Sequence, residues 1–143
     1  MPTRIANAHW EGDFKRGGGT VALSSGAFEG PYNFSGRFED GAGTNPEELL
    51  GAAHAACFAM ALSVGLTQAG TPPESLNVKT KVTISQINNG FAITKIDLDL
   101  RGKVPGIDEA AFREAAEGAK AGCPLSKALA AVPEINLNAT FEA

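Results

Sequence analysis

Apolar residues recur along the chain in two spacings, one typical of helices and one typical of strands. The longest apolar stretch runs from residue 46 to about residue 69 and predicts a single helix. Asn45 suits the N-cap, Pro46 suits the first helical position, and Glu48 completes a capping box. Gly70, followed by two prolines, is a typical helix stop. A helix of about 24 residues is roughly 36 Å long, enough to cross a small domain.

Shorter segments on both sides of this helix predict strands. Their apolar residues alternate with polar ones, or the segments are separated by turn-forming residues. The predicted strands are residues 8–11, 20–23 and 32–34 before the helix, 78–85 and 93–100 after it, and 135–141 near the end. The turn at 88–90, Asn-Asn-Gly, joins two of them into a hairpin with one wet face. The long helix is the expected cover for its other face.

Two further helices are predicted before the last strand. One runs from its cap at Asp108 to about residue 121 and is stopped by Gly122. The other opens at Cys123 and Pro124 and runs through residue 131. The resulting order, βββ-α-ββ-αα-β, indicates an α+β fold rather than a doubly wound sheet. No repeat or linker interrupts it, so a single domain of residues 1–143 is expected.

Composition narrows the classes of partner. The net charge is -4 and lysines and arginines do not cluster, which argues against nucleic acid and anionic membrane. The N-terminal residues lead into no apolar run, so no signal peptide and a cytoplasmic location are expected. Residues 49–66 are long enough to span a membrane, but His54, Ser63 and the many alanines favour a buried soluble helix.

The two cysteines are the candidate chemistry. Cys57 lies in the middle of the apolar helix, where a thiol is often inert. Cys123 caps a predicted helix, whose free N–H groups favour a thiolate. Inert thiols, metal ligands and redox chemistry all remain open. His54 lies one turn before Cys57, but a metal site lacks a fourth ligand, and a Cys–His hydrolase lacks a group to orient the imidazole.

Several segments taken together resemble the OsmC/Ohr family. Residues 43–62, GTNPEELLGAAHAACFAMAL, resemble the helix of the first cysteine, and residues 121–126, AGCPLS, resemble the second cysteine motif. The segment AHWEG at 8–12 also matches. The segments FAITKI at 91–96 and VPGID at 104–108 are closer to the OsmC branch than to the Ohr branch. The resemblance covers essentially the whole chain.

This resemblance implies a function and a mechanism. Members of the family reduce organic hydroperoxides, and hydrogen peroxide more weakly, with two cysteines and without a metal or other cofactor. Cys57 would form a sulfenic acid, and Cys123 would close a disulfide with it. An external dithiol, of lipoyl type or thioredoxin-like, would then reopen the bridge. The alternative is a non-catalytic thiol or metal-binding domain of the same fold.

The resemblance also implies the residues around the thiol. Arg37, held by Glu47, would stabilise the thiolate, so the pKa of Cys57 is expected to lie below its usual value. The apolar candidates for a substrate pocket, which fit a plain core equally well, are Phe34, Phe38, Phe58 and Met60.

The spacing on the long helix has a consequence for assembly. Glu47 and Cys57 are ten positions apart, about 15 Å along the axis, which no glutamate side chain spans. A second, antiparallel copy of the helix would bring the two residues together at a crossing near residue 52. The residues there are small, namely Gly51, Ala52, Ala53, Ala55 and Ala56. They would equally admit a strand or helix of the same chain. Because the family resemblance implies intertwined dimers, an intertwined obligate homodimer is predicted.

Overall fold

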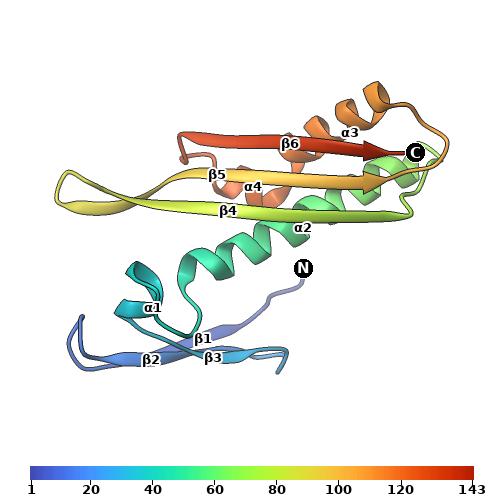
Figure 1. Ribbon diagram of the computed structural model, residues 1–143. Helices are drawn as coiled ribbons and strands as arrows, with labels where there is room; N and C mark the ends of the chain where they lie inside the picture. Colours follow the sequence, from blue (N-terminus) through green and yellow to red (C-terminus); the bar gives the residue numbers. More distant parts are fainter. The chain divides into compact units, whose positions relative to one another are not determined.

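The computed structural model describes residues 1–143 as two compact units, residues 1–49 and residues 50–143 (Figure 1). The first unit holds β1 (Ala6–Glu11), β2 (Gly18–Leu23), β3 (Glu29–Tyr32) and α1 (Phe34–Phe38). Helix α2 (Pro46–Gln68) runs across the boundary. The second unit holds β4 (Ser75–Ile87), β5 (Gly90–Lys103), α3 (Glu109–Gly122), α4 (Pro124–Ala128) and β6 (Glu134–Glu142). The α+β class is confirmed, and a single domain for the whole chain stays a prediction.

The first unit is an antiparallel meander with the order β1-β2-β3, followed by one short helix. The strand predicted at 32–34 is wrong at its end, because β3 stops at Tyr32 and α1 begins at Phe34. The reason is local, since the Asn33 side chain accepts a hydrogen bond from the Gly36 N–H at 2.7 Å and caps the helix. Residue 33 therefore starts a helix that the apolar pattern did not indicate.

Helix α2 has the bounds that its end signals predict. The Asn45 side chain accepts from the Glu48 N–H at 2.8 Å, which confirms the N-cap. The Glu48 carboxylate does not complete the box, because it accepts instead from the Thr44 hydroxyl at 2.8 Å. Gly70 follows the helix with φ of +83°. By length and composition α2 alone would qualify as a membrane span, but it is a core helix, since Phe58 and other residues of one face are buried.

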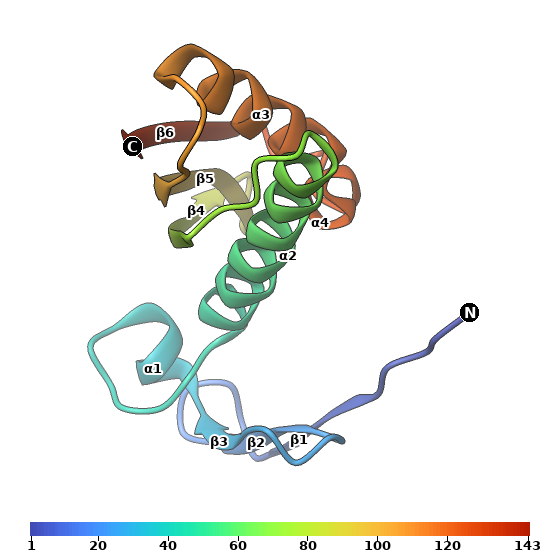
Figure 2. The ribbon, with the colours of Figure 1, turned by 90° about the vertical axis from the view of Figure 1, so that its right-hand side faces the viewer.

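The second unit is a three-stranded sheet with the order β4-β5-β6. The predicted hairpin is confirmed, since β4 and β5 pair antiparallel. Asn88 and Asn89, in the turn between them, both have left-handed backbone angles. Strand β6 pairs parallel with β5, so the chain crosses over through α3 and α4. Helices α2, α3 and α4 lie on one side of this sheet (Figure 2).

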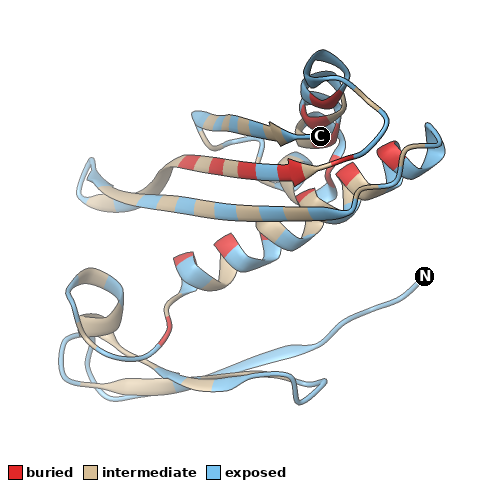
Figure 3. Ribbon diagram, turned by 45° about the vertical axis from the view of Figure 1, so that its right-hand side comes forward, coloured by how far each residue is buried: buried red, intermediate tan, exposed pale blue.

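The core of the second unit lies between its sheet and these helices. Buried positions alternate with exposed or half-buried ones along β5 (Figure 3). The fully or almost fully buried apolar side chains include Phe58, Leu62 and Leu66 of α2, Ile96, Leu98 and Leu100 of β5, and Phe112 of α3. Helix α2 approaches β4 closely at Gly51, where an added Cβ would be 2.7 Å from the Thr80 hydroxyl. The predicted role of α2 as cover of the hairpin is confirmed.

Candidate active site

The two cysteines, 66 positions apart in the sequence, meet in the second unit. Cys57 comes from the middle of α2, and Cys123 stands at the junction that ends α3 and begins α4. Their Sγ atoms are 2.8 Å apart and both thiols are free. Cys123 is fully buried, whereas Cys57 is half-buried. A disulfide therefore needs only a small movement of the two sulfurs, and Cys57 is the more accessible of them.

The surroundings of the two sulfurs affect their pKa values in opposite directions. Burial raises the pKa of the Cys57 thiol, the hydrogen bond with Cys123 raises it further, and only the Leu125 N–H opposes them. Burial also acts to raise the pKa of Cys123, but the hydrogen bond with Cys57 and the interactions with Ser126 and Leu125 outweigh it and lower that pKa. The direction for Cys57 is opposite to the expectation. The physical reason is that burial and the hydrogen bond with Cys123 outweigh the single N–H that favours the thiolate.

His54 lies one turn before Cys57 and is fully buried. Its Nε2 is 2.8 Å from the Ser126 hydroxyl oxygen, and its Nδ1 has no hydrogen-bond partner. Burial lowers the pKa of this imidazole, which is therefore neutral near pH 7. No group of three or more His, Cys, Asp or Glu side chains in the chain is arranged to hold a metal ion.

Arg37 and Glu47 form an ion pair within the first unit. The Arg37 Nε donates to both carboxylate oxygens at 3.1 Å, and its Nη2 donates to Oε1 at 2.8 Å. The Glu47 side chain is 8% exposed and that of Arg37 is 36% exposed, so the carboxylate fixes a partly accessible guanidinium. The Arg37 guanidinium also lies 5.3 Å from the centre of the Phe38 ring. The structure thus brings these two residues together, and their role toward Cys57 stays a prediction.

An aromatic cavity of about 170 Å³ lies beside this ion pair in the first unit. It is lined by Trp10, Phe14, Tyr32, Asn33, Phe34, Arg37 and Phe38. Two of the four apolar candidates, Phe34 and Phe38, therefore lie beside Arg37. Phe58 is instead in the core of the second unit, and Met60 is 71% exposed on α2.

Part of this cavity was not predicted from the sequence, and neither was the pairing of the buried His54 with Ser126. Trp10 carried a signal, since it lies in the AHWEG segment of the family resemblance. Phe14 carried none, because its packing on the Phe34 and Phe38 rings is a tertiary contact. Ser126 lies in the second cysteine motif, but its pairing with His54 joins residues 72 positions apart.

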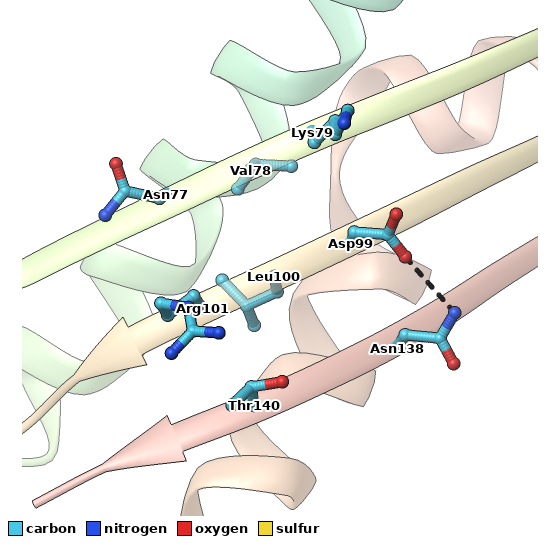
Figure 4. A pocket seen from close by; sticks show the side chains of 8 residues that line it. All are labelled: Asn77, Val78, Lys79, Asp99, Leu100, Arg101, Asn138 and Thr140. Atoms are coloured by element: carbon cyan, nitrogen blue, oxygen red, sulfur yellow. Dashed lines mark hydrogen bonds between the residues drawn. The ribbon is translucent and has the colours of Figure 1, made fainter.

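A larger depression of about 410 Å³ lies on the second sheet (Figure 4). Side chains from all three strands line it, namely Asn77, Val78, Lys79, Asp99, Leu100, Arg101, Asn138 and Thr140. Asn138 donates to Asp99 at 3.2 Å, and this hydrogen bond lowers the pKa of the carboxyl. No nucleophilic thiol or histidine lines it. The thiol pair is therefore the candidate active site.

The chain is similar to members of one known family in sequence and in fold. A sequence model of the OsmC-like protein family matches residues 39–138. The chain is 54% identical over 132 residues to Peroxiredoxin OsmC of Escherichia coli, covering 92% of this chain and 91% of that protein. Among solved structures, an organic hydroperoxide resistance protein from Elizabethkingia anophelis has a TM-score of 0.73 at 27% identity, with 99% of each chain covered. An OsmC-like protein from Mycoplasma pneumoniae has a TM-score of 0.76 at 18% identity, with the same coverage, and shows the fold alone. The resemblance of the two cysteine motifs is thereby confirmed, and the chain belongs to the OsmC family.

Proposed function

We propose that this protein is a cysteine peroxidase that reduces organic hydroperoxides, and hydrogen peroxide more weakly, to alcohol or water. The observation that carries the proposal is the pair of free thiols with sulfurs 2.8 Å apart. Their chain is 54% identical to a protein named Peroxiredoxin OsmC. No metal or other cofactor is needed, because sulfur itself carries the two electrons.

Cys57 is more exposed than Cys123, which supports a mechanism in which Cys57 reacts with the peroxide first. The Cys57 thiolate, the more accessible sulfur, attacks the distal oxygen of ROOH. An S–O bond forms, the O–O bond breaks, and the leaving alkoxide takes a proton to become ROH. The Cys123 thiolate then attacks the sulfur of the Cys57 sulfenic acid, so that an S–S bond forms and hydroxide leaves as water. An external dithiol, of lipoyl type or thioredoxin-like, reduces the disulfide by exchange.

The first step needs a cation near Cys57, since burial in its own chain raises the pKa of this thiol. Arg37, held by the buried Glu47 carboxylate, is the group that we propose for this role. Its planar guanidinium can donate to the sulfur and to the leaving oxygen. The aromatic rings beside Arg37 would then hold the organic group of the hydroperoxide, with Phe34 and Phe38 as its main contacts.

We further propose that Arg37 and Glu47 come from a second copy of the chain, in an intertwined homodimer. Helix α2 supports this, because an exposed row of apolar residues follows one of its faces. The row consists of Ala52, Ala56, Met60 and Val64, which are one turn apart. Two such rows packed antiparallel would cover each other. We also propose a cytoplasmic location, where reducing conditions would return the disulfide to two thiols.

A titration of free thiols tests the peroxidase. With one equivalent of cumene hydroperoxide, the enzyme should lose both of its two thiols within seconds. Cys57→Ser should abolish turnover, and Cys123→Ser should stop after one oxidation and leave a sulfenic acid at Cys57 that overoxidises readily. A non-catalytic thiol domain would lose no thiol on this time scale. A metal-binding domain would respond to a chelator, which should leave the peroxidase unchanged. Full turnover by Cys57→Ser would show that the two roles are wrongly assigned.

A further inference from the structure

One hydrogen bond joins the two elements that carry the cysteines. The His54 Nε2 lies 2.8 Å from the Ser126 hydroxyl oxygen. His54 belongs to α2 and lies three positions before Cys57, so the two side chains share a face of that helix. Ser126 belongs to α4 and lies three positions after Cys123. Helix α2 and the start of α4 thus meet twice, once through the two sulfurs at 2.8 Å and once through this bond.

The burial of His54 costs free energy that hydrophobic packing does not explain. The side chain is fully buried, and its Nδ1 has no hydrogen-bond partner. The bond to Ser126 is therefore the only hydrogen bond of the ring. An apolar side chain of similar size would fill the same space without leaving a buried nitrogen unpaired. What a hydrogen bond adds to packing is direction, because it fixes one orientation between the two elements that it joins.

Few other contacts fix α4 on the rest of the second unit. The junction is tied to α3, since the Cys123 N–H donates to the Ala119 carbonyl at 2.9 Å. Beyond it, the five residues of α4 are all exposed or half-buried, and no side-chain hydrogen bond caps the helix at Cys123. Leu125 packs on the core but is only partly buried. A helix of five residues is not stable by itself, so its place on α2 depends strongly on the bond to His54.

We propose that His54 and Ser126 are positioning residues whose hydrogen bond holds the start of α4 on α2 and keeps the two cysteine sulfurs within reach of each other. The inference rests on the proposed function, because it concerns the step in which Cys123 closes the disulfide with Cys57. Neither positioning residue contacts the peroxide or exchanges a proton. The bond and the disulfide join the same two elements, so each reduces the conformational entropy that formation of the other must remove. The bond therefore favours the disulfide over the two thiols.

The equilibrium between the two thiols and the disulfide tests this contact without a peroxide. In mixtures of reduced and oxidised glutathione, the two thiols pass two electrons and two protons to oxidised glutathione, which becomes two thiols. The fraction of disulfide is read by acid quenching and alkylation of the remaining thiols. Ser126→Ala should lower the equilibrium constant for the disulfide by roughly three- to tenfold, which is about 15–30 mV for this two-electron couple. A merely structural role would destabilise both forms equally and leave the constant unchanged.

Variants of His54 connect the shift to the hydrogen bond. His54→Leu should lower the constant by a similar factor and should have no further effect in a Ser126→Ala background, because both changes remove the same bond. His54→Gln and Ser126→Thr keep a group that can form the bond, and each should recover most of the wild-type constant. Ser85→Ala is the matched control, since it removes a half-buried hydroxyl bonded to Thr94 at 2.9 Å in the β4–β5 hairpin. It should leave the constant at the wild-type value.

The outcomes separate this inference from the proposed peroxidase. An unchanged equilibrium constant in folded Ser126→Ala would overturn the inference, and so would an equal shift in Ser85→Ala. If the wild-type chain loses no thiol to cumene hydroperoxide while Ser126→Ala still shifts the glutathione equilibrium, the proposed peroxidase fails and the positioning contact stands.

Discussion

Cys57 lies where its own chain favours the protonated thiol, because burial and the neighbouring Cys123 both raise its pKa. Peroxide chemistry needs the thiolate, which is the nucleophilic form. Cys123 has the opposite setting: burial acts to raise its pKa, but the hydrogen bond with Cys57 and the interactions with Ser126 and Leu125 outweigh burial and lower it. At the scale of single residues, the surroundings within one chain therefore favour the thiolate of Cys123, the proposed resolving thiol. Cys57, the proposed attacking thiol, would need a cation to become a thiolate.

Replacing Arg37 by Ala tests whether this arginine is the missing cation. In a Cys123→Ser background, so that one thiol reports, the iodoacetamide rate profile of Cys57 should move to higher pH. Peroxide attack near neutral pH should slow by roughly tenfold or more, because a charge-assisted hydrogen bond to the thiolate is lost. Arg37→Lys should recover part of the effect, since it restores charge without the planar fork. Arg101→Ala, which removes an exposed arginine paired with Glu142, is the matched control. A profile that Arg37→Ala leaves in place would exclude this role.

At the scale of elements, local signals determined what could be predicted. Helix α2 was predicted to within about one residue at either end, because Asn45, Pro46 and Gly70 act on the backbone next to them. The hairpin followed from alternation and its Asn-Asn-Gly turn. The helix α1 was missed although Asn33 is a local cap signal like Asn45, because its five residues are too few to show a helical repeat and its Phe34 ring packs on the distant Phe14.

In the candidate site, too, residues with a local sequence signal could be predicted, whereas contacts made by tertiary packing could not. The two cysteine motifs were readable because each has a recognisable local sequence, and the resemblance paired them. That their sulfurs lie 2.8 Å apart is a result of tertiary packing between α2 and the α3–α4 junction. The parallel pairing of β6 with β5, which follows the crossover through these helices, was equally invisible in the alternation of residues 135–141. The bond between His54 and Ser126 likewise has no local signal.

The close approach of α2 to β4 gives a prediction at this scale. Gly51→Ala would place a methyl group 2.7 Å from the Thr80 hydroxyl and 3.3 Å from the Val82 side chain, so the helix must shift on the hairpin. We expect a loss of roughly 1–3 kcal/mol in the free energy of unfolding, measured by urea denaturation. Gly65→Ala is the control in the same helix, because nothing lies within 4 Å of its added Cβ. Its better helix propensity should raise stability by about 0.5–1 kcal/mol. Equal effects of the two changes would contradict the proposed contact.

For the whole molecule, the first unit has no fully buried apolar core of its own. None of the apolar side chains of residues 1–49 is buried, and every residue of β1 is exposed. A three-stranded sheet needs a covered apolar face to be stable. Helix α2 also leaves apolar side chains uncovered, namely its exposed row of Ala52, Ala56, Met60 and Val64. A second copy of the chain would meet both deficits, as the proposed intertwined homodimer requires.

Ala52→Leu tests this assembly, because Ala52 is exposed in the single chain. A larger side chain there has little effect on a monomer, but it would separate two helices that cross at this position. We expect association at least tenfold weaker by light scattering across a dilution series, with stability and peroxidase activity falling together. Ala111→Leu, the same change at an exposed alanine of α3, should leave the assembly intact. If the wild-type chain is a stable and active monomer at every concentration, each site is built from one chain. Arg37 would then have to reach Cys57 without a partner.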